Sequence, residues 1–217
     1  MEIRGALKKR FMLLASAAFM IGLPAANAWA QDPNPPFTGF QLKSTPFNND
    51  QFLPISTINN ILSGTVNICS INGSPGGNMS PELSWTDAPP ATHSFVMVMY
   101  DVTAAFTHWG MYNIPGHANN LPANAGAAGS SFGAQVVNDF GNVGYGGPCP
   151  PANVAPFVHT YVFTLYALDV ELTLPSSANF PANAETLYHA LIEAGRGDHI
   201  LASTSLVGLY STTNSPN

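Results

Sequence analysis

Two long runs of this chain are apolar at nearly every position, and they constrain the fold more than any other feature. Residues 94–102 read SFVMVMYDV, and residues 160–168 read TYVFTLYAL. β-branched and aromatic residues favour extended strands, and a strand that is apolar on both sides must be covered on both faces. The first run therefore predicts a strand covered on both faces, and the second, which is aromatic and β-branched, predicts another long strand.

Shorter segments predict further strands. Residues 108–114 alternate in polarity and end at Pro115, which cannot donate a hydrogen bond to a β-ladder. Residues 205–210 (SLVGLY) predict a last strand, and residues 40–42 can open a first one. Residues 56–68 mix polar and β-branched positions, and we expect an irregular strand there.

Helix is scarce, and long loops connect the strands. Only residues 183–193 (NAETLYHALIE) have a helical pattern, with Asn183 as the N-cap and Gly195 as the end. Residues 115–135 and 138–158 predict two long loops, the second rich in Gly and Pro. The predicted fold is mainly β, a two-sheet β-sandwich with long loops and a C-terminal helix, in a single domain.

The first 30 residues have the three parts of a cleavable signal peptide. A basic region that ends at Arg10 precedes an uncharged apolar stretch over residues 11–23, and Ala28-Trp29-Ala30 supplies the small-x-small cleavage pattern. The apolar stretch is shorter than the roughly 20 residues that span a bilayer. We expect cleavage after Ala30 or Ala28, a domain over residues 31–217 with an ordered core of about 37–211, and a periplasmic or secreted location. A retained anchor is the alternative.

Removal of residues 1–30 would change the charge of the chain. Four of the six Lys and Arg residues lie in that segment, which leaves Lys43 and Arg196 against eleven acidic residues and a net charge of −9. Such a surface repels nucleic acid and anionic membranes, because it has no basic patch to neutralise phosphates. Any anion site must then use local, preorganised donors.

The chain has two cysteines, Cys69 and Cys149. In an oxidising compartment such a pair predicts one disulfide, although two buried free thiols are the alternative. Closing a loop of this length would stabilise the fold by about 4 kcal/mol in the chain-entropy model.

One group of polar residues predicts a ligand pocket at the rim of the sandwich. Imidazole, phenol and carboxylate groups lie where predicted strands begin or end, and backbone N–H groups of a glycine-rich loop can form an anion nest. The predicted ligand-binding residues are Asp101, His108, Gly144, Gly146, Gly147, Pro148, His159 and Tyr161. Alternatively, each polar residue only satisfies a local hydrogen bond.

The order of the motifs resembles the phosphatidylethanolamine-binding protein (PEBP) family, specifically its bacterial Raf-kinase-inhibitor-like group. The matching segments, over roughly residues 37–211, are Ser80–Trp85, Tyr100–Asp101, His108–Trp109, Tyr112–Pro115, Asn138–Gly141, Gly144–Pro151, His159 with Tyr161, and His199–Tyr210. The resemblance implies a β-sandwich whose one small pocket binds phosphate-like groups, including the phosphoryl head group of phosphatidylethanolamine. Its wall would be Asp101, His108, the backbone of residues 144–148, His159 and Tyr161.

Two motifs depart from the family pattern. Where the family has D-P-D-x-P, this chain has Asp101-Val102-Thr103-Ala104-Ala105, and where the family has H-R-Y it has His159-Thr160-Tyr161. The pocket edge is therefore expected to differ in shape, and a cation of the family motif is missing.

Together these features predict an exported binding protein for a small anion such as phosphate, phosphoethanolamine or acetate. We expect no turnover, no cofactor, no metal and no nucleic-acid partner. One alternative is a protease- or kinase-inhibitor-like module with an unidentified protein partner. Another is a metal-dependent hydrolase with Asp101, His108 and His159 as ligands, although the chain has no H-E-x-x-H or G-x-S-x-G element.

Overall fold

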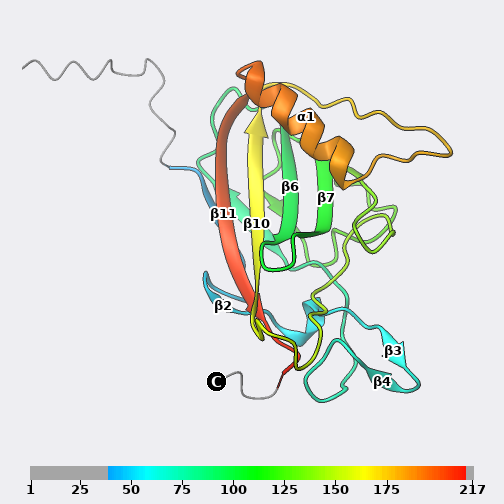
Figure 1. Ribbon diagram of the computed structural model, residues 1–217. Coiled ribbons are helices and arrows are strands. Elements are labelled where there is room, and N and C mark those ends of the chain that lie inside the picture. The colour runs from blue at the N-terminus through cyan, green and yellow to red at the C-terminus, as the bar shows by residue number, and fades with distance from the viewer. Residues whose placement is uncertain (1–38, 214–217) are drawn as a thin grey trace, which may run out of the picture. The chain divides into compact units, whose positions relative to one another are not determined.

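The computed structural model describes residues 39–213, and this part of the chain is mainly β with one helix (Figure 1). A single 3₁₀ turn covers Ile55–Thr57, and the helix α1 covers Ala184–Arg196. The strands are β1 (Gln41–Lys43), β2 (Gln51–Phe52), β3 (Leu62–Ser63), β4 (Val66–Asn67), β5 (Leu83–Thr86), β6 (Ser94–Asp101), β7 (Phe106–Pro115), β8 (Asn120–Leu121), β9 (Ala134–Gln135), β10 (His159–Leu168) and β11 (Ile200–Tyr210).

The strands form two packed sheets and a separate hairpin. The larger sheet has six strands in the order β2-β11-β10-β6-β7-β9, and the smaller has three in the order β1-β5-β8. Strands β3 and β4 pair only with each other. Figure 1 shows β11, β10, β6 and β7 side by side, with α1 crossing one face of this sheet.

The position of β6 between two packed layers explains why its sequence is apolar throughout. Phe95, Met97 and Met99 point into the core shared with the three-stranded sheet, whereas Val96 and Val98 point into a second core beneath α1. Successive side chains of a strand point to opposite faces, so a strand between two layers must be apolar at every position. The prediction of a mainly β, two-sheet sandwich with a C-terminal helix is confirmed.

The prediction of one irregular strand over residues 56–68 is wrong. The segment instead forms the 3₁₀ turn and the β3–β4 hairpin, with Gly64 at φ +65° in the hairpin turn. The buried Asn67 side chain donates to the carbonyl oxygens of Asn59 and Ser74, at 2.9 and 3.1 Å. Side-chain hydrogen bonds of this kind compete with ladder formation and favour turns.

The helix begins as predicted and ends later. Asn183 caps the helix, with its side chain accepting from the Thr186 N–H at 3.0 Å. Gly195 does not end the helix, which continues to Arg196 and is capped by Gly197. A glycine inside a helix costs only about 1 kcal/mol relative to alanine, so packing can override it. Within residues 39–213, no helix has the length and apolarity to cross a membrane.

Candidate functional site

The candidate site lies where three strand ends meet at one edge of the large sheet. Strand β6 runs antiparallel to both β7 and β10, so its last residue lies beside the first residues of those strands. Asp101 is in register with Phe106 of β7 and with Tyr161 of β10. Because side chains alternate along a strand, His108 and His159 lie two residues away on the same face as these register partners.

A pocket of about 170 Å³ opens at this edge. Its lining contains the four polar side chains predicted from the sequence together with residues that the sequence did not single out. The lining residues are Asp101, Ala104, Phe106, His108, Phe140, Cys149, Pro150, Pro151, His159 and Tyr161. Gly144, Gly146, Gly147 and Pro148 lie behind this wall and do not line it.

The carboxylate of Asp101 holds His159 in one orientation. Asp101 Oδ2 accepts from His159 Nδ1 at 2.6 Å, and Oδ1 accepts from the N–H groups of Thr103 and Ala104 at 2.8 and 3.1 Å. An ionised carboxylate can only accept hydrogen bonds, so His159 Nδ1 must carry the proton. The Nε2 atom of His159 is therefore the nitrogen left for a ligand.

His108 is fixed in the same way by a backbone carbonyl. Its Nδ1 donates to the oxygen of Gly146 at 2.7 Å, which leaves Nε2 for the pocket. Burial lowers the pKa of His108 below its ordinary 6.5, and this outweighs the opposing effects of the Gly146 carbonyl and the Asp101 carboxylate. The imidazole is therefore neutral at pH 7 in the empty pocket, and Nε2 is a hydrogen-bond acceptor.

Tyr161 contributes a buried hydroxyl. The residue is fully buried, and its hydroxyl makes no well-formed hydrogen bond within the described residues, although the Asp101 carboxylate lies close enough to interact with it. Burial raises the pKa of this phenol above its usual range, and the nearby Asp101 carboxylate adds to the shift. Tyr161 therefore stays protonated and can donate to a ligand.

Aromatic rings fix the two imidazoles from the sides. The ring of His108 lies edge-on to Tyr161 with centroids 5.1 Å apart, and Phe106 and Phe140 pack against it at 5.0 and 5.3 Å. The ring of His159 is stacked on Tyr161 at 6.4 Å. Such packing restricts the rotamers of both histidines, so the pocket is preformed.

The predicted nest of glycine N–H groups is wrong, because those groups are already bonded. The N–H of Gly144 donates to Val136 O at 3.2 Å, and that of Gly146 donates to His108 O at 2.9 Å. The N–H of Gly147 donates to Asn78 Oδ1 at 2.7 Å, and Pro148 has no N–H to offer. The backbone N–H groups of residues 144–148 are therefore engaged within the protein and form no anion nest.

Cys149 lines the pocket although the predicted ligand-binding set did not include it. It lies beside Pro150 and Pro151 in the wall and is bonded to Cys69. The sequence signal for this residue was its place between two prolines that lack N–H groups, in a loop that leads directly to His159.

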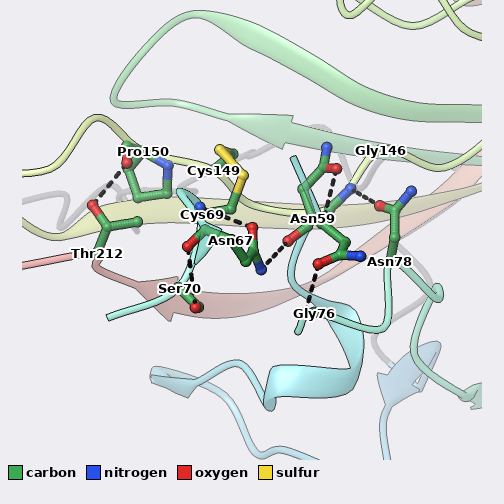
Figure 2. The surroundings of a disulfide bond; sticks show 12 residues. Asn59, Asn67, Cys69, Ser70, Gly76, Asn78, Gly146, Cys149, Pro150 and Thr212 are labelled. Carbon is green, nitrogen blue, oxygen red and sulfur yellow. Dashed lines mark hydrogen bonds between the residues drawn. A yellow bond between two sulfur atoms is a disulfide. The ribbon is translucent and has the colours of Figure 1, made fainter. Parts of the chain in front are cut away.

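A disulfide ties the pocket loop to a preceding segment. Cys69 and Cys149 are joined with an S–S distance of 2.02 Å, and Figure 2 shows Asn59, Asn67 and Asn78 around the bond. Asn59 N–H donates to Pro148 O at 3.1 Å, and Asn78 accepts from Gly147 on the same loop. The segment around Cys69 thus holds the pocket loop at several points.

The metal-dependent alternative requires ligands that converge on one point. Within the described residues, no three His, Cys, Asp or Glu side chains are grouped so that they could hold a metal ion. Both oxygens of Asp101 are engaged by hydrogen-bond donors, one of them His159 Nδ1. The geometry is that of a hydrogen-bonded pair facing an open pocket.

Comparison with protein families gives one match over most of the chain. The family model described as phosphatidylethanolamine-binding protein matches residues 43–211. A UPF0098 protein of Aquifex aeolicus is 39% identical over 140 residues, which cover 62% of this chain and 75% of the relative. The UPF0098 protein YbcL of Escherichia coli is 38% identical over 135 residues, covering 57% of this chain and 72% of YbcL.

Solved structures are similar over a larger part of the chain. The crystal structure of E. coli YbcL, described as a new member of the mammalian PEBP family, superposes with a TM-score of 0.62 at 29% identity and covers 80% of this chain and 98% of YbcL. A putative PEBP homologue from Chlamydia trachomatis gives a TM-score of 0.59 at 29% identity, with coverages of 80% and 97%.

Proposed function

Because the chain belongs to the phosphatidylethanolamine-binding protein family, we propose that its pocket binds the oxyanion of a small ligand without chemical turnover. The ligand is a phosphate, a phosphomonoester such as phosphoethanolamine, or a carboxylate such as acetate. A pocket of about 170 Å³ fits the phosphoryl head group of a lipid but not a drug-sized molecule, since such ligands occupy roughly 300–1,000 Å³.

The observation that carries this proposal is the buried hydroxyl of Tyr161, which faces the pocket without a well-formed hydrogen bond within the described residues. Leaving a buried hydroxyl without a hydrogen bond costs about 1–3 kcal/mol, so native structures rarely keep one without a reason. A ligand oxygen in the pocket would satisfy it. His108 and His159 line the same space, and their Nε2 atoms, left free by the Nδ1 hydrogen bonds, would give that oxyanion further polar contacts.

The charges of the pocket favour a ligand that brings or gains a proton. Among the described residues no Lys or Arg lines the pocket, whereas the Asp101 carboxylate does. A phosphate monoanion can donate its own proton to the neutral Nε2 of His108. A phosphate dianion instead requires His108 in the imidazolium form, because an unpaired buried charge is strongly unfavourable. In both cases the complex holds one proton more than the unliganded site and the free phosphate dianion hold together.

The test is titration calorimetry of the protein without residues 1–30 against phosphate, phosphoethanolamine and acetate. Tyr161→Phe removes only the hydroxyl, and we expect it to weaken phosphate binding about tenfold, the loss of one hydrogen bond to a charged group. Tyr166→Phe is the matched control, since Tyr166 lies on the same strand outside the pocket. Absence of heat for all three anions at millimolar concentrations would contradict the proposal.

The lining residues also support binding without turnover. None of them is Ser, Thr or Lys, and the lining cysteine is in a disulfide, so hydroxyl, amine and thiol nucleophiles of these types are missing from the wall, and the carboxylate of Asp101 is engaged by His159 and backbone N–H groups. We expect no release of phosphate or alcohol from phosphomonoesters and phosphodiesters followed by phosphorus NMR. Catalytic release that His159→Ala abolishes would instead establish an enzyme.

We further propose that the protein works outside the cytoplasm, in the periplasm or secreted. The basic, apolar and small-x-small parts of residues 1–30 lie outside the described residues, and they support this proposal from the sequence alone. The Cys69–Cys149 disulfide adds support, because such bonds persist in oxidising compartments. N-terminal sequencing of the fractionated protein should begin at Gln31 or Trp29. An intact N-terminus in the cytoplasmic fraction would refute export.

A further inference from the structure

A second hollow lies at the ends of β6 and β7, on the opposite face of the large sheet from the proposed ligand pocket. Tyr100 precedes Asp101, and Thr107 precedes His108, along their strands. Neighbouring residues of a strand point to opposite faces, so Tyr100 and Thr107 face the side that α1 covers. The hollow has a volume of about 320 Å³, within the range of small-molecule sites. We call it the helix-side hollow, and its lining includes Tyr100, Thr107, Asp139, Glu185, Tyr188 and Ile192.

One side of α1 forms a wall of the helix-side hollow. Glu185, Tyr188 and Ile192 are three and four residues apart, so they follow one side of the helix. Tyr188 reaches from the helix to β7, where its hydroxyl lies 3.2 Å from Thr107 Oγ1. Its ring meets that of Tyr100 edge-on, with centroids 6.2 Å apart and an interplanar angle of 85°. The two rings therefore form a fixed aromatic corner.

Carboxylates lie beside this aromatic corner, and among the described residues no Lys or Arg lines the hollow. The carboxylate of Asp139 is held in place, because its Oδ2 accepts from Thr107 N–H at 2.6 Å while Asp139 N–H donates to Thr107 O at 3.0 Å. The carboxylate of Glu185 is 81% exposed, with Oε1 3.8 Å from His189 Nε2. The hollow thus combines negative charge with aromatic faces.

An anion fits the helix-side hollow poorly, although the hollow lies at the N-terminus of α1. The N–H of Ala184 already donates to Val137 O at 3.1 Å, and that of Thr186 donates to Asn183 Oδ1 at 3.0 Å. Glu185 adds a negative charge to the first turn, where it offsets the helix dipole. An anion would therefore meet two carboxylates and backbone donors that are already bonded.

A divalent metal ion also fits poorly. Within residues 39–213, no three His, Cys, Asp or Glu side chains are grouped so that they could hold a metal ion. An organic ammonium group needs no such set of ligands, because the face of a tyrosine ring attracts it electrostatically. The half-exposed Ile192 can in addition contact alkyl groups of such a ligand.

We propose that the helix-side hollow binds an alkylammonium cation, with the charged group at the aromatic corner and close to Asp139 and Glu185. Aromatic corners and cages are the usual recognition sites of quaternary ammonium groups. The rest of the molecule favours cations as well, since the described residues hold two cations, Lys43 and Arg196, against ten acidic side chains. The site is independent of the proposed oxyanion pocket, so either proposal can fail alone.

The test is heteronuclear NMR of the protein without residues 1–30, titrated with choline chloride and, separately, with sodium chloride at equal ionic strength. We expect saturable shifts of the backbone amides of Thr107, Glu185 and Tyr188 with choline only, at a Kd on the order of 1 mM. Dimethylbutanol, the uncharged carbon analogue of choline, should bind at least tenfold more weakly. Phosphocholine should also shift these amides more weakly than choline, because its phosphate meets the carboxylates of the hollow.

Two variants test the two kinds of contact. Tyr188→Leu removes one ring of the corner and should weaken choline binding about tenfold. Glu185→Gln removes one charge and should weaken it about fivefold, the upper range for an exposed ion pair. Glu193→Gln is the matched control, since it removes the same charge from the same helix outside the hollow. Its choline affinity should stay within about twofold of wild type, because salt screens distant charges.

Several results would overturn the proposal. Unshifted amides at tens of millimolar choline, or dimethylbutanol that binds as tightly as choline, would do so directly. Equal losses in Glu185→Gln and Glu193→Gln would leave only the long-range field of the protein. Shifts confined to Asp101, His108 and His159 would place the cation in the other pocket, and tighter binding of phosphocholine than of choline at Glu185 would assign the hollow to a phospholipid head group. Should Tyr188→Leu fail to fold, the exposed Glu185→Gln carries the test alone.

Discussion

His159 Nδ1 lies 2.6 Å from Asp101 Oδ2, and the two side chains are only 8% and 3% exposed. A second pair of the same kind, His199 Nδ1 and Asp169 Oδ1, is 2.9 Å apart but 45% and 39% exposed. The described part of the chain thus contains one His–Asp hydrogen bond in the pocket and one exposed to solvent. Because water and ions screen the second, the two pairs should differ sharply in energy.

Asp101→Asn should destabilise the protein by about 2 kcal/mol, the typical loss for a buried hydrogen bond to a charged group. It should also weaken phosphate binding at least tenfold, because an asparagine amide can present either a donor or an acceptor to His159 and no longer fixes its tautomer. Urea unfolding measures the first effect, and titration calorimetry measures the second.

Asp169→Asn is the matched control, since it removes a carboxylate from the solvent-exposed pair. We expect a change of stability within about 0.5 kcal/mol and no change in phosphate affinity. If Asp101→Asn changes stability and phosphate affinity as little as Asp169→Asn does, the hydrogen bond to His159 is not what matters. Asp101 then acts through its contacts with the N–H groups of Thr103 and Ala104.

Stability without ligand should fall as the pH falls below about 6.5. Burial lowers the pKa of His108 in the folded protein, so the unfolded chain binds a proton that the folded chain refuses. The lowered pKa of His108 does not change the free energy of unfolding above the unfolded pKa. It reduces that free energy as the pH falls from the unfolded pKa toward the folded pKa. His108→Gln, which cannot titrate, should flatten this part of the stability–pH curve measured by urea unfolding.

Phosphate affinity should decrease as the pH rises through the second pKa of the free phosphate. The complex holds one proton more than the unliganded site and a dianion, and burial lowers the pKa of His108, so the site itself does not hold that proton at neutral pH. Calorimetry in buffers of different ionisation enthalpy should show proton uptake on binding at pH 7. Binding that takes up no proton at pH 7 would mean that the ligand meets only neutral donors such as Tyr161.

Removing the disulfide should weaken both the fold and the site. The bond closes a sequence separation of 80 residues, so Cys69→Ala with Cys149→Ala should destabilise the protein by about 4 kcal/mol in the chain-entropy model. Because Cys149 lines the pocket, phosphate affinity should fall as well. Thermal unfolding and calorimetry of the double variant test both effects. An unchanged affinity would show that the Asn59 and Gly147 hydrogen bonds alone hold the loop.

The sequence predicted the parts of the fold that single strands determine. The apolar run of β6 must be covered on both faces, and the run of β10 is long, aromatic and β-branched, so both could be assigned without knowing their neighbours. Strand β5, with four residues, and β9, with two, exist because a partner strand pairs with them. Such short pairings carry too little local pattern to predict.

The same distinction, between features set by a single strand and features set by distant partners, separates the correct and wrong parts of the predicted site. The positions of Asp101, His108, His159 and Tyr161 follow from where strands begin and end, and the structure brings these four together. Whether a backbone N–H is free depends on distant partners such as Asn78, which lies 69 residues from Gly147. No local pattern contains that information, and the glycine nest was therefore mispredicted.

The close approach of residues 57–59 gives Gly147 a steric role that can be tested. A Cβ atom at Gly147 would lie 2.2 Å from Thr57 O and 2.6 Å from Asn59 N, both backbone atoms that cannot turn aside. Gly147→Ala must therefore push the pocket loop away from residues 57–59. We expect a loss of at least about 2 kcal/mol of stability, typical of overpacking, together with weaker phosphate binding because Cys149 moves with the loop.

Gly195→Ala is the opposite case and serves as the control. Its Cβ would meet only Ile200 Cδ1, at an ordinary 3.6 Å, and the residue lies inside α1 with no positive φ. Alanine restricts the unfolded chain more than glycine does, so this substitution should stabilise the protein by about 0.5–1 kcal/mol. Phosphate affinity should not change. Urea unfolding of both variants decides the matter: if Gly147→Ala is as well tolerated as Gly195→Ala, the close approach between the pocket loop and residues 57–59 is not what requires glycine there.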